Sequence, residues 1–198
     1  MEVDPQDVID SAKSAAEAHA RLNAAVAVTV AILATFMGIC KVKDDNIVQA
    51  MQQAQADKLD HWAFYQARNL RQEIAEGIAL QLELARASQP ANRAAEYDKS
   101  IAKYRALAAS QAEKKEELRL QALNDQKTYD ALNYRDDQFD LSDAALALAI
   151  ALLAVTALTQ LWPLYWAALV PTAFGIMMGV AGLAGWQLHP EWLVRLLS

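Results

Sequence analysis

Two long uncharged stretches flank a charged segment in this chain. The first stretch, residues 22–40, contains no charged side chain and is bracketed by Arg21 and Lys41. Its length is close to the roughly 20 residues that an α-helix needs to cross the hydrocarbon core of a bilayer. We therefore predict a transmembrane helix at residues 22–40, preceded by a short helix within residues 1–21. A cleaved signal peptide is disfavoured because the segment before the stretch is acidic rather than basic.

The second uncharged stretch is long enough for two more spans. It covers residues 144–188, and Trp162, Pro163 and Tyr165 interrupt it with side chains that favour a membrane interface or break a helix. We predict transmembrane helices at residues 144–161 and 165–188, followed by an interfacial tail at residues 189–198. Trp186 and Trp192 are expected to mark the opposite interface.

Small residues recur along the last predicted span. Gly175 and Gly179 form a GxxxG motif, and Gly182 extends the same face. Small side chains let helix backbones approach closely, so this face is expected to pack against another helix. The partner helix can belong to the same chain or to a neighbour, and the motif alone leaves both open.

The charged segment at residues 41–143 has a composition that strongly favours helix. Its single proline, Pro90, predicts one turn near residues 88–92, and hence two long antiparallel helices. Apolar residues recur at heptad spacing in the second arm: Tyr97, Ile101, Tyr104, Ala108, Leu118, Ala122, Tyr129, Leu132 and Phe139, interrupted by Gln111, Lys115, Asp125 and Asp136. The apolar side of the first arm is expected to comprise Ile47, Met51, Ala54, Trp62, Leu70, Ile74 and Ile78.

The predicted fold is therefore all-α, with three transmembrane helices and a long antiparallel coiled-coil hairpin inserted between the first and second. A two-helix hairpin without a globular core buries little surface per residue. We expect several copies to associate into a homo-oligomer.

Few residues of the sequence are candidates for catalysis or for binding a metal or cofactor. The formal net charge of -6 argues against nucleic-acid binding, and the single cysteine, Cys40, excludes an internal disulfide. The histidines lack a metal-ligand spacing, and no cofactor motif is present, so neither a metal nor a cofactor is expected. Adjacent carboxylates such as Asp136 and Asp137 point in different directions on a helix, which predicts solvated charge rather than acid–base catalysis.

Residues 61–71 carry a resemblance to a known family. The sequence from Trp62 through Tyr65, Gln66, Ala67 and Arg68 to Arg71 resembles the Trp-x-x-Tyr-Gln-Ala-Lys/Arg box of an uncharacterised bacterial membrane-protein family, domain of unknown function 4337. Arginine stands at Arg68 and Arg71 where lysine is more usual. The resemblance covers most of the chain and implies a bacterial inner membrane, but it implies no activity.

Two interpretations of this box remain. Trp62, Tyr65 and Asn69 can share one helix face, whereas Phe64, Arg68 and Arg71 are expected on another. Aromatic residues at helical spacing are typical of a packing layer. The alternative is a surface for a ligand or protein partner, to which Arg68 and Arg71 contribute charge.

Basic residues predict the orientation of the chain. Lys41, Lys43, Lys127, Arg135 and Arg195 lie near the membrane on the hairpin side, against Lys13 and Arg21 on the amino side. This favours a cytoplasmic hairpin and carboxyl terminus. These features favour a non-enzymatic, oligomeric scaffold that is embedded in membrane lipid. Its coiled coil is expected to bind a protein partner. A channel-like oligomer is the alternative, and a membrane enzyme is the weakest hypothesis.

Overall fold

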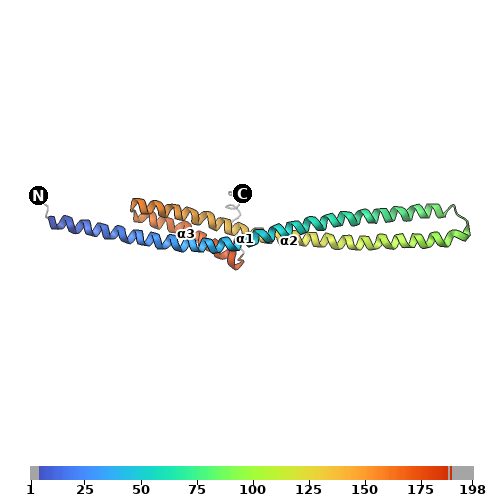
Figure 1. The fold of residues 1–198 in the computed structure, drawn as a ribbon, viewed down its shortest axis with the longest axis horizontal. Coiled ribbons are helices and arrows are strands. Elements are labelled where there is room, and N and C mark those ends of the chain that lie inside the picture. Colours follow the sequence, from blue (N-terminus) through green and yellow to red (C-terminus); the bar gives the residue numbers. More distant parts are fainter. Residues whose placement is uncertain (1–4, 187, 189–198) are drawn as a thin grey trace. The chain divides into compact units, whose positions relative to one another are not determined.

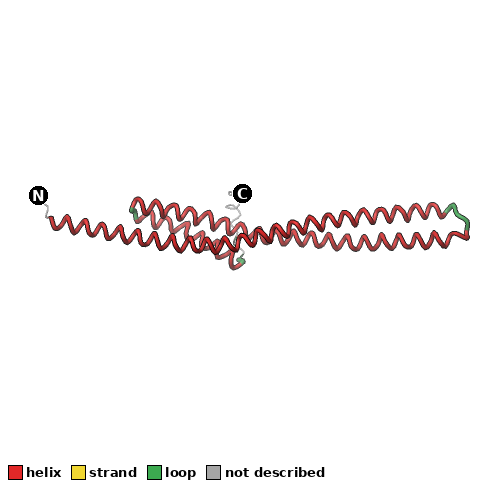
Figure 2. Tube along the Cα trace, in the orientation of Figure 1, coloured by secondary structure: helices red, strands yellow, loops and turns green. Residues whose placement is uncertain are grey.

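The computed structural model describes residues 5–186 and 188, and this part of the chain is helical almost throughout (Figures 1 and 2). Helix α1 comprises Pro5–Arg86, the short 3-10 helix η1 Ala91–Arg93, α2 Ala94–Thr159 and α3 Trp162–Ala184. Consecutive helices run antiparallel. The prediction of an all-α fold is confirmed, and α1, α2 and α3 each contain a stretch long and apolar enough to cross a membrane.

The chain divides into two compact units. One, the three-helix unit, comprises residues 1–49 and 132–198, and the other, the hairpin unit, comprises residues 50–131. The interfacial tail predicted at residues 189–198, with Trp192 and Arg195, lies outside the described residues.

The turn of the hairpin unit lies where Pro90 predicts it. Helix α1 ends at Arg86, and the amides of Ser88 and Gln89 donate to the carbonyls of Ala85 and Arg86. The Arg86 guanidinium forms a two-point ion pair with Asp98 on α2, at 2.5 and 2.9 Å. A bidentate pair of this kind fixes geometry as well as charge, so it clamps the two helices where they leave the turn.

The seam of α2 follows the predicted heptad. None of its positions from Tyr97 to Tyr129 is exposed, and Ile101, Ala108 and Ala122 are buried. The green and yellow-green ribbons of α1 and α2 run side by side along this seam (Figure 1).

The seam of α1 departs from the prediction. Leu70 and Ile74, expected on the packed side, are 57% and 53% exposed. The side chains that face α2 instead follow a regular heptad that includes polar residues: Met51, Ala54, Lys58, His61, Tyr65, Arg68, Gln72, Ala75, Ala79 and Leu82. The expectation holds for Ile47, Met51 and Ala54, which are buried, and is wrong for Leu70 and Ile74. The seam follows heptad spacing, and its members Lys58, His61 and Arg68 pair with polar residues of α2.

The three-helix unit has a core to which α1, α2 and α3 all contribute. Its core contains Leu22 and Leu33 from α1, Leu146 and Leu153 from α2, and Ala168 from α3. At one end, Gln160 donates to Asn23 at 2.8 Å and the hydroxyls of Thr29 and Tyr165 lie 3.1 Å apart. At the other end, side chains of α2 donate hydrogen bonds to carbonyls at and beyond the end of α3.

The ends of α2 and α3 differ slightly from the predicted ones. Trp162 and Pro163 lie in the first turn of α3 rather than in the connection, because proline is tolerated where a helix has unpaired amides. The connection is made by Gln160, whose φ of 58° is left-handed, and the extended Leu161. Helix α3 ends at Ala184 rather than near residue 188, because Gly185 adopts a left-handed φ of 71° that caps it.

Burial in the hairpin seam makes one substitution diagnostic. Ala75 is completely buried, so Ala75→Asp places an unpaired carboxylate in the seam and is expected to lower the free energy of unfolding by roughly 2 to 4 kcal/mol. Loss of the helical circular-dichroism signal on heating measures it. Ala106→Asp, at an exposed position of α2, is the matched control and should cost only roughly 0.7 kcal/mol, the difference in helix propensity. Equal effects at both positions would contradict this seam.

Candidate functional site

A cluster of carboxyl groups lies in the three-helix unit, between α1 and α2. Asp136, Asp140 and Asp143 follow one another at spacings of four and three residues, which places them on one face of α2. Asp44 of α1 lies close to them and is only 4% exposed, although an ionised carboxylate is rarely buried without a partner. The cluster combines excess negative charge with partial burial.

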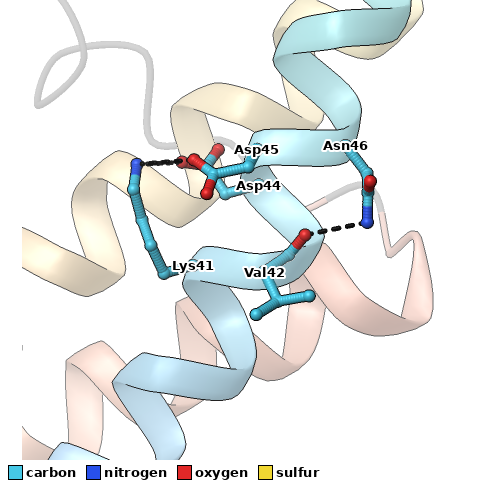
Figure 3. A network of polar contacts seen from close by, with 5 residues as sticks. All are labelled: Lys41, Val42, Asp44, Asp45 and Asn46. Atoms are coloured by element: carbon cyan, nitrogen blue, oxygen red, sulfur yellow. Dashed lines mark hydrogen bonds and ion pairs between the residues drawn. The ribbon is translucent and has the colours of Figure 1, made fainter.

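Lys41 is the cation in contact with this cluster. Its ammonium donates to Asp44 Oδ2 at 2.8 Å and lies 3.4 Å from Asp45 Oδ1 (Figure 3). The hydrogen bond and the charge of Asp44 hold the pKa of Lys41 above its usual range. Asn46, on the same helix, donates instead to the carbonyl of Val42 at 2.9 Å. One lysine does not neutralise Asp44 together with the three carboxyl groups of α2.

Asp136 is the group most affected. Burial, a hydrogen bond with Asp44 and the charges of Asp140, Asp44 and Asp137 raise the pKa of Asp136 to about 7. Burial and neighbouring carboxylates also raise the pKa values of Asp140 and Asp143, while Lys41 opposes the shift.

The geometry around Asp44 agrees with a proton in this cluster. Asp44 Oδ1 is buried and has no hydrogen-bond donor among the described residues, and Asp44 is one of the groups that raise the pKa of Asp136. Two carboxyl groups can form a hydrogen bond only if one of them retains a proton. The raised pKa of Asp136 favours a proton shared by these two groups. Nowhere in the described part of the chain are three or more His, Cys, Asp or Glu side chains placed to hold a metal ion.

This cluster was not predicted from the sequence, because Asp136 and Asp137 were expected to be solvated. Asp136 is instead half-buried against Asp44. The signal that could have found it is the spacing of Asp136, Asp140 and Asp143 directly before an uncharged stretch. The contribution of Asp44 could not be found this way, because it comes from a distant part of the chain.

The box at residues 62–71 lies in the hairpin unit. The rings of Trp62 and Tyr65 meet edge to face with centroids 5.3 Å apart, and the Lys115 ammonium lies 5.8 Å from the centroid of Tyr65. Both aromatic side chains are half-buried. This arrangement is that of a packing layer with a cation–π contact.

The two arginines of the box differ in position. Arg68 lies in the seam and donates to Gln111 at 3.0 Å, whereas Arg71 and Phe64 are exposed. The expectation that Phe64, Arg68 and Arg71 share one face is therefore wrong, because Arg68 occupies a seam position of the heptad. Of the two charges, that of Arg71 faces the solvent.

Polar residues that interrupt the seam of α2 are paired across it. Besides Arg68 with Gln111, Lys115 donates to Asn69 at 2.9 Å and Lys58 to Gln126 at 2.5 Å. His61 Nδ1 and Asp125 Oδ2 lie 2.7 Å apart. These pairs specify one register of the hairpin, because each requires its own partner on the other helix.

The glycines of α3 allow close contact within the three-helix unit. A Cβ atom at Gly175 would lie 2.7 Å from Leu146 Cγ, one at Gly179 2.7 Å from Phe36, and one at Gly182 2.9 Å from the ring of Phe139. Ser142 donates to the Gly175 carbonyl at 2.8 Å. The structure thus places all three glycines against helices of the same chain.

Side chains of α2 also satisfy the carboxyl end of α3. Arg135 donates to the carbonyl of Gly182 at 2.8 Å, and Gln138 donates to the carbonyls of Trp186 and Leu188 at 2.8 and 2.7 Å. The last carbonyls of a helix lack intrahelical donors, so these bonds hold the end of α3 in place.

Comparison with known families decides the relationship suggested by the box. The family model described as Domain of unknown function (DUF4337) matches residues 22–185. The chain belongs to the DUF4337 family. No curated protein and no solved structure matches it.

The DUF4337 match spans the features described above. It begins at Leu22, a fully buried core residue, and ends at Gly185, the cap of α3. The carboxyl cluster, the hairpin seam and the glycines of α3 all lie within it. These features can therefore be sought in other DUF4337 sequences as three separate sets of residues.

Close packing at Gly175 predicts a stability effect. Gly175→Val is expected to lower the free energy of unfolding by roughly 1 to 3 kcal/mol, because the added atoms collide with Leu146 and the Ser142 carbonyl. Unfolding of the detergent-solubilised protein by dodecyl sulfate, followed by circular dichroism, measures this. Gly38→Val is the control, since a Cβ there meets nothing within 4 Å. A neutral Gly175→Val would show that α3 does not pack as described.

The raised pKa of Asp136 predicts a pH dependence. A carboxyl group whose pKa is raised in the folded state stabilises the fold fully below its unfolded pKa of about 3.8, and this contribution is lost as the pH rises through about 7. We expect thermal stability in detergent to fall between pH 4 and pH 7. Asp136→Asn should reduce this slope and raise stability at pH 8, because the amide is uncharged.

The control for this series is Asp60→Asn, at an exposed position of α1 in the hairpin unit. It should leave the slope unchanged. The groups around Asp136 that can contribute to the remaining slope are Lys41, Asp44 and Asp45 on α1 and Asp137, Asp140 and Asp143 on α2. If Asp136→Asn and Asp60→Asn show the same slope as the parent protein, Asp136 does not hold the proton.

Proposed function

We propose that this chain is a non-enzymatic scaffold of the bacterial inner membrane. Its three apolar helical stretches span the bilayer, and several copies associate to present the hairpin as a cytoplasmic stalk for a protein partner. The single observation that carries the membrane assignment is the outward face of the three-helix unit. Large apolar side chains cover that face on every helix, among them Val28 and Ile32 on α1, Leu158 on α2 and Val170 on α3.

The exposure of these side chains is high. Leu158 is 85% and Val170 72% exposed, and in the most apolar window of α1 only 17% of the residues are buried. Contiguous apolar surface on this scale is unfavourable in water, whereas hydrocarbon solvates it at no cost. Helix α3, with 23 residues, is roughly 34 Å long at 1.5 Å per residue, which matches the roughly 30 Å hydrocarbon core.

The hairpin supports the scaffold role because polar side chains pair across its interior and fix the alignment of α1 with α2. The seam is filled by alanine, a few larger apolar residues and the cross-seam polar pairs. A stalk of this kind offers a partner its outer faces. The aromatic layer at Trp62 and Tyr65 stiffens it, and the exposed Arg71 adds a positive charge to the outside.

Native mass tests the assembly. The full chain is expected to stay in the membrane fraction after an alkaline wash and, once solubilised in a mild detergent, to have a mass of at least two copies by light scattering. A chain released by the wash would contradict the membrane assignment. A monomer at all concentrations would contradict the scaffold.

Cysteine labelling tests the orientation. In a Cys40→Ser background, Ser88→Cys at the exposed turn of the hairpin is expected to resist a membrane-impermeant maleimide in intact cells and to react after lysis. Ser14→Cys, exposed on α1 before the first apolar stretch, is the matched control and should react in intact cells. The opposite pattern would place the hairpin outside the cytoplasm.

A further inference from the structure

A second apolar stripe runs along α1 in the hairpin unit, on the side that does not face α2. Its positions are spaced by four and three residues, the spacing of a coiled-coil seam. We call it the outer stripe: Ala63, Ala67, Leu70, Ile74, Gly77, Gln81 and Leu84. All seven residues are exposed, and six of them are apolar or small. The helix thus carries two seams, of which the structure fills one.

The outer stripe is wider than its seven positions. Leu59 and Leu80 lie beside it on one edge and Phe64 on the other, and each of these side chains is more than half exposed. In the hairpin unit α2 exposes fewer large apolar side chains, namely Leu107, Leu120 and Leu123, and it carries exposed charges such as Lys103 and Glu113. Apolar exposure in a monomer is usually scattered, so the alignment of six large exposed apolar side chains along one side of α1 indicates a contact surface.

We infer that the outer stripe binds the outer stripe of a second copy of this chain, with the two α1 helices parallel. This inference rests on the proposed membrane scaffold, because copies inserted in one membrane carry α1 in the same direction. Heptad spacing requires a helical partner rather than a flat surface. In a parallel pair each residue meets its own counterpart, so Leu70, Ile74 and Leu84 each form an apolar layer, and Gly77 lets the helices approach.

Flanking charges agree with the parallel arrangement. In a parallel coiled coil, a residue that flanks the seam on one helix faces the flanking residue five positions later on the other helix. Gln66 therefore lies opposite the partner's Arg71, and Glu73 lies opposite the partner's Ile78. If the two α1 helices were antiparallel, with their outer stripes overlapping along the whole length, Arg71 would lie near Arg71 of the other copy. Glu73 would likewise lie near Glu73 of the other copy. Like charges at these positions select against the antiparallel pair.

The area of the outer stripe fits an association that needs the membrane. Burying one large aliphatic side chain removes roughly 60 to 120 Å² of apolar surface. Five such residues are more than half exposed, namely Leu59, Leu70, Ile74, Leu80 and Leu84. With five such side chains on each copy, a pair would bury roughly 600 to 1,200 Å² of apolar surface, which is at or below the low end for a specific contact. Confinement of both copies to one membrane raises their effective concentration and favours the pair.

Cross-linking in native membranes tests this inference on the full chain. In a Cys40→Ser background, Leu70→Cys and, separately, Leu84→Cys are expected to form disulfide-linked dimers under mild oxidation, because like positions meet in a parallel pair. Glu113→Cys, exposed on the outward face of α2, is the matched control and should give about tenfold less dimer, the equivalent of roughly 1.4 kcal/mol. Leu70→Cys that cross-links only when coexpressed with Ile74→Cys would overturn the parallel arrangement.

A second variant separates this inference from the proposed function. Leu70→Glu combined with Ile74→Glu changes only exposed positions, so the helical content and the labelling of Ser88→Cys should stay as in the parent chain. The cross-linked fraction at Leu84→Cys is expected to fall about tenfold. If the oligomer and this cross-link persist, copies associate by another surface, which overturns the outer stripe and leaves the scaffold intact. A parent chain that is monomeric in the membrane would overturn both.

Discussion

The unbroken backbone hydrogen-bond ladder of α1 and α2 is the constraint on which the other features depend. After Pro5, α1 contains no proline up to Arg86, and α2 contains none at all. A helix satisfies its own amides and carbonyls and can therefore exist in hydrocarbon and in water alike. Because the ladder does not break, side chains at fixed spacing stay on one face over many turns. This regularity allows the carboxyl cluster, the seam and the outer stripe to form.

Within the hairpin, polar groups in the seam contribute specificity more than stability. A seam of alanines and leucines alone would tolerate a slip by one heptad, because each layer resembles the next. Arg68 with Gln111 and His61 with Asp125 require one alignment, since a slip would separate each donor from its acceptor. Burying such groups costs desolvation free energy that a good pair only offsets. The stretches of α1 with Ala75 and Ala79 supply the close packing between these pairs.

Much of the fold could be predicted from the sequence because two simple signals dominate it. The length of the uncharged stretches predicts the helices of the three-helix unit. Pro90, the single proline of the charged segment, predicts the turn of the hairpin. The seam of α1 could not be predicted from apolar residues, because Leu70 and Ile74 lie outside it and Lys58 and His61 lie on it. The pairing of Asp44 with Asp136 was equally hidden, since it depends on how two distant helices meet. The box at Trp62 and Tyr65 could be located, but which face Arg68 occupies required the structure.

The carboxyl cluster changes how the charge of the molecule should be counted. A formal net charge of -6 treats every carboxyl group as ionised. Burial and neighbouring carboxyl groups raise the pKa of Asp136 to about 7, so this residue contributes less negative charge at neutral pH than the count assumes. The negative charge of the three-helix unit near neutral pH is therefore smaller than the formal count implies.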